Sequence, residues 1–204
     1  MKKIILSVTK EDDSSVYSLS EQNKSKIVKK YKSKCAACHI NISDYHHIHV
    51  ENSQFIPLCG LCYYPLHLDK IITKNPGSII LLPEIDQIQL NSILRAMEFV
   101  KLKKEDYEEV ADAIDIIEVL LKERADMADT YYSSGVSNVN LVSQVLFSFS
   151  DDDYKVRETG LFGLRLMHNM DNFEKEMKSW ELELAKYKPE KWKDFIKKVA
   201  ESQK

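Results

Sequence analysis

Glycine and proline are scarce in this chain, with five of each among 204 residues, and the glycines are scattered. Their scatter excludes a glycine-rich loop that cradles phosphates. We find no internal repeat and no low-complexity segment. Apolar residues make up 44% of the chain, so we expect a folded protein with one good core, or a small unit beside a larger one.

Long apolar runs are also missing. No segment approaches the roughly 20 apolar residues that cross a bilayer. Near the amino terminus, the short run Ile4-Ile5-Leu6 is interrupted by Lys10-Glu11-Asp12-Asp13 before it reaches the length of an export signal. We therefore expect a cytoplasmic protein without membrane insertion.

Arginine contributes only four of the 29 basic residues, although it is the side chain best suited to bidentate phosphate and guanine contacts. The most basic segment runs from Lys24 to Lys34, and residues 1–75 carry 11 basic against 7 acidic side chains. Such a segment either meets phosphates or forms a solvated helix face. We favour the solvated face and expect no nucleic-acid partner, and a DNA-binding module stays open as an alternative.

Cysteine is limited to four residues, arranged as Cys35-x-x-Cys38 and Cys59-x-x-Cys62. With His39, the first pair also matches the haem attachment pattern, but that reaction takes place outside the cytoplasm. A thioredoxin-like redox site needs a single motif, whereas this chain has two. The two-plus-two spacing is typical of a structural zinc site made of four thiolates.

Four thiolates fill the coordination shell of zinc and leave no position for a catalytic water. We therefore predict one structural Zn²⁺ held by Cys35, Cys38, Cys59 and Cys62. The alternative is four unrelated buried thiols.

The hydrophobic periodicity predicts an α+β protein with a zinc-binding module over residues 1–75 and a mostly helical region over residues 76–204. Asn75-Pro76-Gly77-Ser78 marks the boundary. The pattern predicts strands at residues 2–8, 15–19 and 78–83, and a hairpin formed by residues 45–50 and 54–58. Helices are expected at residues 25–32, after Cys62, around two apolar stripes, at 138–148 and 152–168, and over the carboxy-terminal residues. The stripes are Leu90, Ile93, Leu94 and Met97, then Val110, Ile114, Ile117 and Leu121; the terminal ones are Phe173, Met177, Trp180 and Leu184, then Trp192, Phe195, Ile196 and Val199.

A His-His pair at the end of a hairpin strand, followed by Cys-x-x-Cys and a helix, resembles the HNH nuclease family. The resemblance implies an HNH-like, treble-clef-like zinc module. In an active enzyme of this family His47 would be the general base, and His46 and His67 would hold a divalent metal at the scissile phosphate. Such chemistry needs a neutral imidazole within reach of water and a metal that stabilises charge.

Several positions depart from the HNH pattern. Tyr63 stands where the family has a histidine, and Gln54 stands where it has the orienting asparagine, with Asn52 out of register. Only eleven residues separate His47 from Cys59. We therefore interpret the nuclease site as degenerate and expect no catalytic residue.

The whole chain also resembles the IcmJ/DotN family, a zinc-binding component of the type IVB (Dot/Icm) secretion coupling complex. The likeness rests on the paired cysteine motifs, on "IILLPEIDQIQLNSILRAMEF" from Ile79 to Phe99, and on "FEKEMKSWELEL" from Phe173 to Leu184. It implies a non-enzymatic adaptor that binds the carboxy-terminal extension of the coupling ATPase. It also implies a cytoplasmic protein that is peripherally associated with the inner membrane through the secretion complex.

Overall fold

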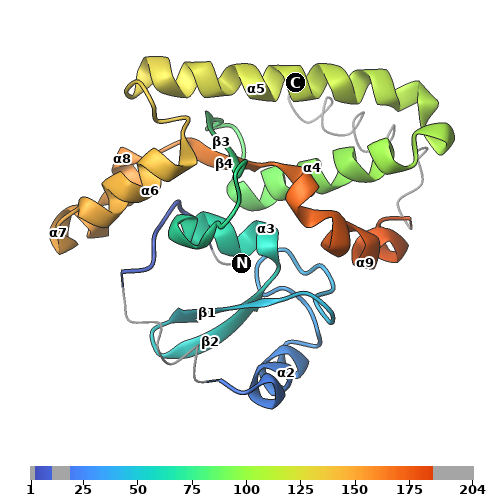
Figure 1. Cartoon of the computed structure of the whole chain (residues 1–204), viewed down its shortest axis with the longest axis horizontal. Helices are drawn as coiled ribbons and strands as arrows, with labels where there is room; N and C mark the ends of the chain where they lie inside the picture. Colours follow the sequence, from blue (N-terminus) through green and yellow to red (C-terminus); the bar gives the residue numbers. More distant parts are fainter. Residues whose placement is uncertain (1–2, 11–18, 186–204) are drawn as a thin grey trace, which may run out of the picture.

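The computed structural model describes residues 3–10 and 19–185, a mixed α/β arrangement in which short antiparallel strands lie among helices. In Figure 1, α5 runs along the top, β3, β4 and α4 lie beneath it, and the β1–β2 hairpin lies at the opposite end with α2. The predicted α+β class is confirmed at this level. The elements in chain order are α2 (Glu21–Lys30), β1 (His47–Glu51), β2 (Gln54–Leu58), α3 (Gly60–Tyr63), η1 (Tyr64–Leu66), η2 (Leu68–Lys70), β3 (Gly77–Leu81), α4 (Gln87–Leu102), η3 (Lys104–Asp106), α5 (Glu108–Tyr131), α6 (Val139–Ser148), α7 (Asp151–Lys155), α8 (Arg157–Gly160), β4 (Leu164–His168), η4 (Met170–Phe173) and α9 (Glu174–Leu184).

The predicted hairpin is confirmed. Strands β1 and β2 pair antiparallel from His47 opposite Leu58 to Glu51 opposite Gln54. Asn52 and Ser53 connect them with φ values of 50° and 60°. Two successive positive φ angles are the signature of the tight hairpin turn whose twist matches that of the strands.

Helix α2 begins four residues earlier than predicted because its amino-terminal cap is Ser20. The Ser20 side chain accepts a hydrogen bond from the backbone amide of Asn23, which satisfies an otherwise free donor of the first turn. At the other end, Lys32 and Ser33 have positive φ and stop the helix before it can continue.

The helix predicted at residues 152–168 is interrupted at residue 156 and is wrong beyond residue 160. Residues 151–155 and 157–160 form the short helices α7 and α8, and Gly163 then adopts φ +78°, which leads the chain into strand β4. Strand β4 pairs antiparallel with β3, from Gly77 opposite His168 to Leu81 opposite Leu164. The partner strand lies more than 80 residues away, so local periodicity carries no trace of the pairing.

The two long helices follow the predicted stripes only in part. In α4, Leu90, Leu94 and Met97 are buried as expected, whereas Ile93 is exposed. In α5, Ile114 and Leu121 are buried but Ile117 is exposed, because the buried line of this helix continues through Ala128 instead. An apolar face of α5 therefore points away from the core.

Three groups of apolar side chains form the core. One surrounds the four cysteines and includes side chains from α4 and α9, so residues from both sides of position 75 contribute to it. A second lies between β3, β4 and α6, and a third between α4, α5 and the same strands. The division into domains at residue 75 stays a prediction.

Residues 3–10 form neither a helix nor a strand, so the strand predicted at 2–8 is wrong over residues 3–8. The segment is anchored by Ser7, whose amide donates to the Pro65 carbonyl and whose carbonyl accepts from the Leu68 amide. Most of the strand predicted at 15–19 and the terminal stripe from Trp192 to Val199 lie outside the described residues. Within the described part, no helix is both long and apolar enough to cross a membrane.

Candidate metal centre

Two tight backbone turns position the four cysteines. In the first, the Cys35 amide donates to the Ile40 carbonyl and the Cys35 carbonyl accepts from the His39 amide, with His39 at φ +61°. In the second, the Cys59 carbonyl accepts from the amides of Cys62 and Tyr63 at the start of α3. The Ala36 amide donates to the Pro57 carbonyl and so holds the first turn against strand β2.

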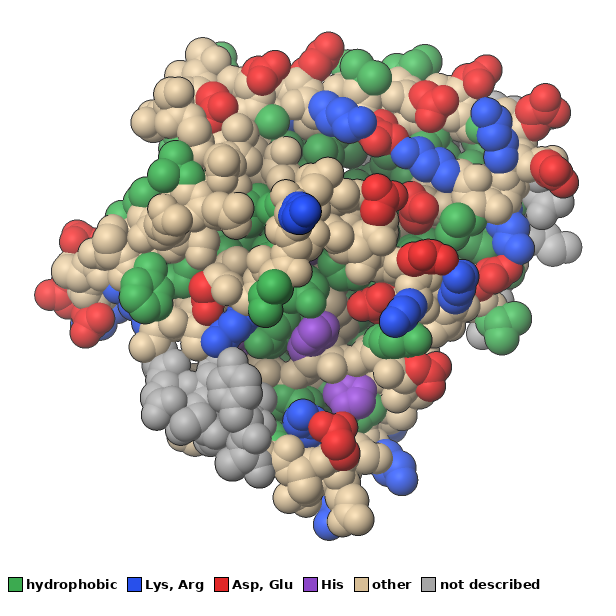
Figure 2. Space-filling view, viewed as in Figure 1, with side chains coloured by type: hydrophobic (Ala, Val, Ile, Leu, Met, Phe, Trp, Pro, Cys, Tyr) green, Lys and Arg blue, Asp and Glu red, His purple; other side chains and the backbone are tan. Residues whose placement is uncertain are grey.

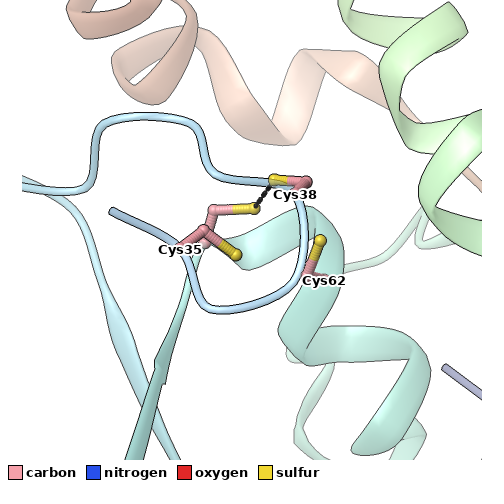
Figure 3. A group of neighbouring side chains, drawn as sticks. Cys35, Cys38 and Cys62 are labelled. Carbon is pink, nitrogen blue, oxygen red and sulfur yellow. Dashed lines mark hydrogen bonds between the residues drawn. The ribbon is translucent and has the colours of Figure 1, made fainter. Parts of the chain in front are cut away.

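These turns bring all four sulfur atoms within 4.8 Å of one another. The sulfurs of Cys38 and Cys59 lie 3.6 Å apart, which is far beyond the length of a disulfide bond. Figure 3 shows the side chains of Cys35, Cys38 and Cys62 converging between the first turn and helix α3. Cys35, Cys59 and Cys62 are buried, and Cys38 is partly exposed. The arrangement can hold one metal ion.

The surroundings of the cluster shift the pKa values of its thiols in opposite directions. Burial raises the pKa of Cys59 well above its usual range. Hydrogen bonds from Cys35, Cys59 and Cys62, with the nearby guanidinium of Arg95 acting in the same direction, hold the pKa of Cys38 well below its usual range. Four thiolates in one buried site repel one another, so full ionisation of the group requires a cation among the sulfurs.

A row of buried polar side chains on α4 faces the sulfurs. The Arg95 guanidinium donates to the Cys38 sulfur at 3.1 Å. The Asn91 side-chain amide donates to the Leu61 carbonyl at 2.7 Å and lies 3.6 Å from the Cys62 sulfur. Hydrogen bonds of this kind reduce the negative charge on metal-bound thiolates and fix the positions of the sulfurs.

The same row connects the cysteine cluster to strand β4. The Gln87 side-chain amide donates to the Asn91 side chain and to the Leu166 carbonyl, and its oxygen accepts from the Leu166 amide at 2.8 Å. Gln87 thus pairs with both backbone hydrogen-bonding groups of Leu166 in β4 while it orients Asn91. Gln87, Asn91 and Arg95 are all buried. Sequence reasoning missed them, although three polar residues spaced by four on one face of the predicted helix were a visible signal.

Two of the histidines proposed for an active nuclease, His47 and His67, pack against Tyr63 of α3. The ring of His47 stacks on Tyr63 at 4.5 Å between centroids, and Tyr63 stacks on His67 at 4.1 Å. The two nitrogens of His67 are both occupied, one 2.9 Å from His49 and the other 2.8 Å from the Thr9 hydroxyl. His67 is therefore held as a buried packing and hydrogen-bonding residue.

Burial also lowers the basicity of these rings. It lowers the pKa of His47 to about 4 and the pKa of His67 to about 3, with neighbouring histidines adding to the effect. A general base works best when its pKa is near the working pH. The Nδ1 atom of His46 is buried without a hydrogen-bond partner among the described residues. Across residues 3–10 and 19–185, the four cysteines are the group of possible metal ligands that converges, and His46, His47 and His67 do not form one.

Comparison with protein-family models and with curated proteins found no match for this chain.

Proposed function

We propose that the four cysteines bind a single structural zinc ion. Tetrahedral zinc with Zn–S bonds of about 2.3 Å places its sulfurs about 3.8 Å apart, and the 3.6 Å between Cys38 and Cys59 suits that geometry. The guanidinium of Arg95 offsets part of the net negative charge of a four-thiolate zinc complex. Zinc would stabilise this part of the core. It would carry no reactive water, because four sulfurs complete its coordination shell.

The order of turn, hairpin, second turn and helix supports an HNH-like, treble-clef-like module. The first cysteine pair precedes β1 and the second pair opens α3, as in the family pattern. The module is shortened, because α3 ends at Tyr63 and is followed by the 3₁₀ turn η1. This shortening removes His67 from the helix on which a nuclease would carry its metal ligand.

On this basis the protein acts as a non-enzymatic adaptor in a type IVB secretion or conjugative coupling complex. Its partner would be the carboxy-terminal extension of the coupling ATPase. It would work in the cytoplasm, at the inner membrane only through that complex. The observation that carries this proposal is that His47 of the hairpin stacks on Tyr63 and His49 hydrogen-bonds with His67, beside a closed four-sulfur site. The partner itself rests on the resemblance of Ile79–Phe99 and Phe173–Leu184 to the IcmJ/DotN family.

The test is a calorimetric titration of the zinc-loaded chain with the ATPase extension. We expect saturable binding by the wild type, and loss of both zinc and binding in Cys59→Ser. His47→Ala serves as the matched control, since it alters the same module without touching a sulfur, and it should retain zinc and binding. Absence of binding by the zinc-loaded wild type would remove the main support for the adaptor.

A second assay separates the adaptor from an HNH endonuclease and from a zinc-dependent DNA-binding module. Zinc-loaded protein is incubated with supercoiled plasmid in magnesium, manganese or nickel. Nicking that is lost in His47→Ala would establish the enzyme. Binding without nicking, with an affinity that falls steeply with salt, would favour DNA binding through the lysines of Lys24–Lys34.

A further inference from the structure

The outer face of α5 carries an apolar strip that no described residue covers. Ile116 is 62% exposed, Leu120 is 54% exposed and Ile117 is 41% exposed. At 100° per residue these three positions lie within one sector of about 100° along one flank of the helix, with Ile116 on the outward side and Ile117 next to the buried line of Ile114, Leu121 and Ala128. Neighbouring exposed apolar side chains on one face mark a surface that binds something, whereas scattered ones need no explanation.

Acidic side chains border this strip. Asp112, Asp115, Glu123 and Asp126 are exposed on the same outward half of α5. Within the described residues, none of these four carboxylates forms an ion pair. Figure 2 shows acidic and hydrophobic side chains side by side along the upper edge of the molecule, where α5 runs. The occupant that suits the face is therefore an apolar helix edged with positive charge.

A second copy of α5 does not have that chemistry. Residues 108–131 contain eight acidic and two basic side chains, a net charge of −6. Two such faces brought together would place like charges beside each other, which costs free energy. The charge on α5 thus disfavours a dimer through this surface.

The carboxy-terminal segment of the chain has the complementary pattern in its sequence. Residues 186–204, which lie outside the described part, contain seven lysines and three acidic residues, a net charge of +4. Trp192, Phe195, Ile196 and Val199 recur at the spacing of one apolar face of a helix. Pro189 precedes this stripe at a position where a helix can begin.

The tether has sufficient reach. The described chain ends after α9, which is fixed near the start of α5 by an ion pair between Glu181 and Lys103. Nineteen further residues can span about 60 Å when extended, whereas all 24 residues of α5 cover about 36 Å. A segment joined at this point meets α5 at a high effective concentration, so weak contacts suffice to hold it.

We propose that residues 189–204 bind the outer face of α5 in the same molecule, with Trp192, Phe195 and Ile196 against Ile116, Ile117 and Leu120 and the lysines along the acidic border. This inference goes beyond the proposed adaptor function and does not depend on it. It gives α5 an intramolecular cover that a partner would have to displace before it could use this face.

Hydroxyl-radical footprinting of the full zinc-loaded chain tests the contact, because it reports the solvent exposure of individual side chains. In the wild type, Ile116, Ile117 and Leu120 should be labelled slowly. In the double variant F195E/I196E they should be labelled several-fold faster, since the charged segment can no longer cover them. Leu182→Glu is the matched control, because Leu182 is an exposed apolar residue of α9 outside the strip.

The reciprocal variant I116E/L120E should speed tryptic cleavage after Lys193 and Lys197 while zinc content stays unchanged, which separates loss of the contact from loss of the fold. Equal labelling of α5 in the wild type and in F195E/I196E would overturn the proposal. Labelling that decreases as protein concentration rises would overturn it in favour of a contact between molecules. Binding of the wild type to phosphatidylglycerol vesicles with α5 fully labelled throughout would instead identify the segment as a membrane-surface helix.

Discussion

The region around the four cysteines and the region around strands β3 and β4 are stabilised by different means. Around Cys35, Cys59 and Cys62 many apolar side chains are buried, but the centre of this core is made of thiols that repel one another once ionised. Between α4, α5 and the β3–β4 ladder, by contrast, aliphatic side chains and methionines fill the space. The first region should therefore depend on a metal and the second on packing. Gln87, Asn91 and Arg95 connect the two regions.

Removal of the metal should have the largest effect. We expect Cys59→Ser, or chelation of the wild type, to abolish amide protection across residues 35–66, because apparent binding free energies for structural zinc are about 10 to 16 kcal/mol. Strands β3 and β4 should keep their protection. Hydrogen exchange with zinc quantification measures both. Ala36→Ser, in the other cysteine turn and without a ligand atom, is the control, and unchanged zinc in Cys59→Ser would refute the ligand assignment.

A cavity in the other region should be the next largest effect. Leu166→Ala removes a fully buried side chain of β4 and should lower the free energy of unfolding by about 2 to 5 kcal/mol. Zinc content should stay at one per chain. Denaturant unfolding measures the loss, with the 83% exposed Leu182→Ala as the near-neutral control. Release of zinc by Leu166→Ala would instead show that the two regions fold as one unit.

Acid should destabilise the contact between the regions through His168, whose Nε2 donates to the Leu61 carbonyl at 3.0 Å. Burial lowers the pKa of His168 to about 4. Below a pH of about 6.5, His168 binds a proton in the unfolded chain but not in the folded chain. Its contribution to the free energy of unfolding is therefore full above that pH and is lost as pH falls toward about 4. The loss should approach about 3 kcal/mol.

His168→Gln keeps a side-chain donor but does not titrate, so it should flatten this part of the stability profile. Unfolding is followed at several pH values while released zinc is recorded, which separates the histidine from protonation of the thiolates. A profile as steep as that of the wild type would assign the acid sensitivity to other groups.

Substitution of Arg95 should have the smallest effect of the four. Arg95→Met removes the hydrogen bond to Cys38 and the positive charge near the sulfurs, and we expect zinc affinity to fall by about 10- to 100-fold. Competition with a chromogenic chelator measures the change. Arg95→Lys keeps the positive charge but not the paired N–H donors of the guanidinium, so its zinc affinity should lie between those of the wild type and Arg95→Met. Unaltered affinity in Arg95→Met would limit Arg95 to packing against Trp180.

Local patterns in the sequence accounted for much of the fold. Several elements were predictable because each depends on residues close together in the chain. They are the two cysteine turns, the hairpin at residues 47–58 and the helices α4, α5 and α6. Where the prediction for 152–168 was wrong, the deciding contact was the pairing of β4 with β3, which is remote in sequence.

The candidate site divides in the same way. The identity of the four cysteines was readable from their spacing, since each two-residue gap forms a tight turn that aims both sulfurs to one side. The buried row on α4 and the stacked rings of His47, Tyr63 and His67 were not readable, because they depend on how separate elements meet. The sequence by itself determined which thiols gather, through short-range turn geometry. Only the tertiary structure decided what surrounds them, because burial, stacking and hydrogen bonds to α4 arise when distant segments pack together.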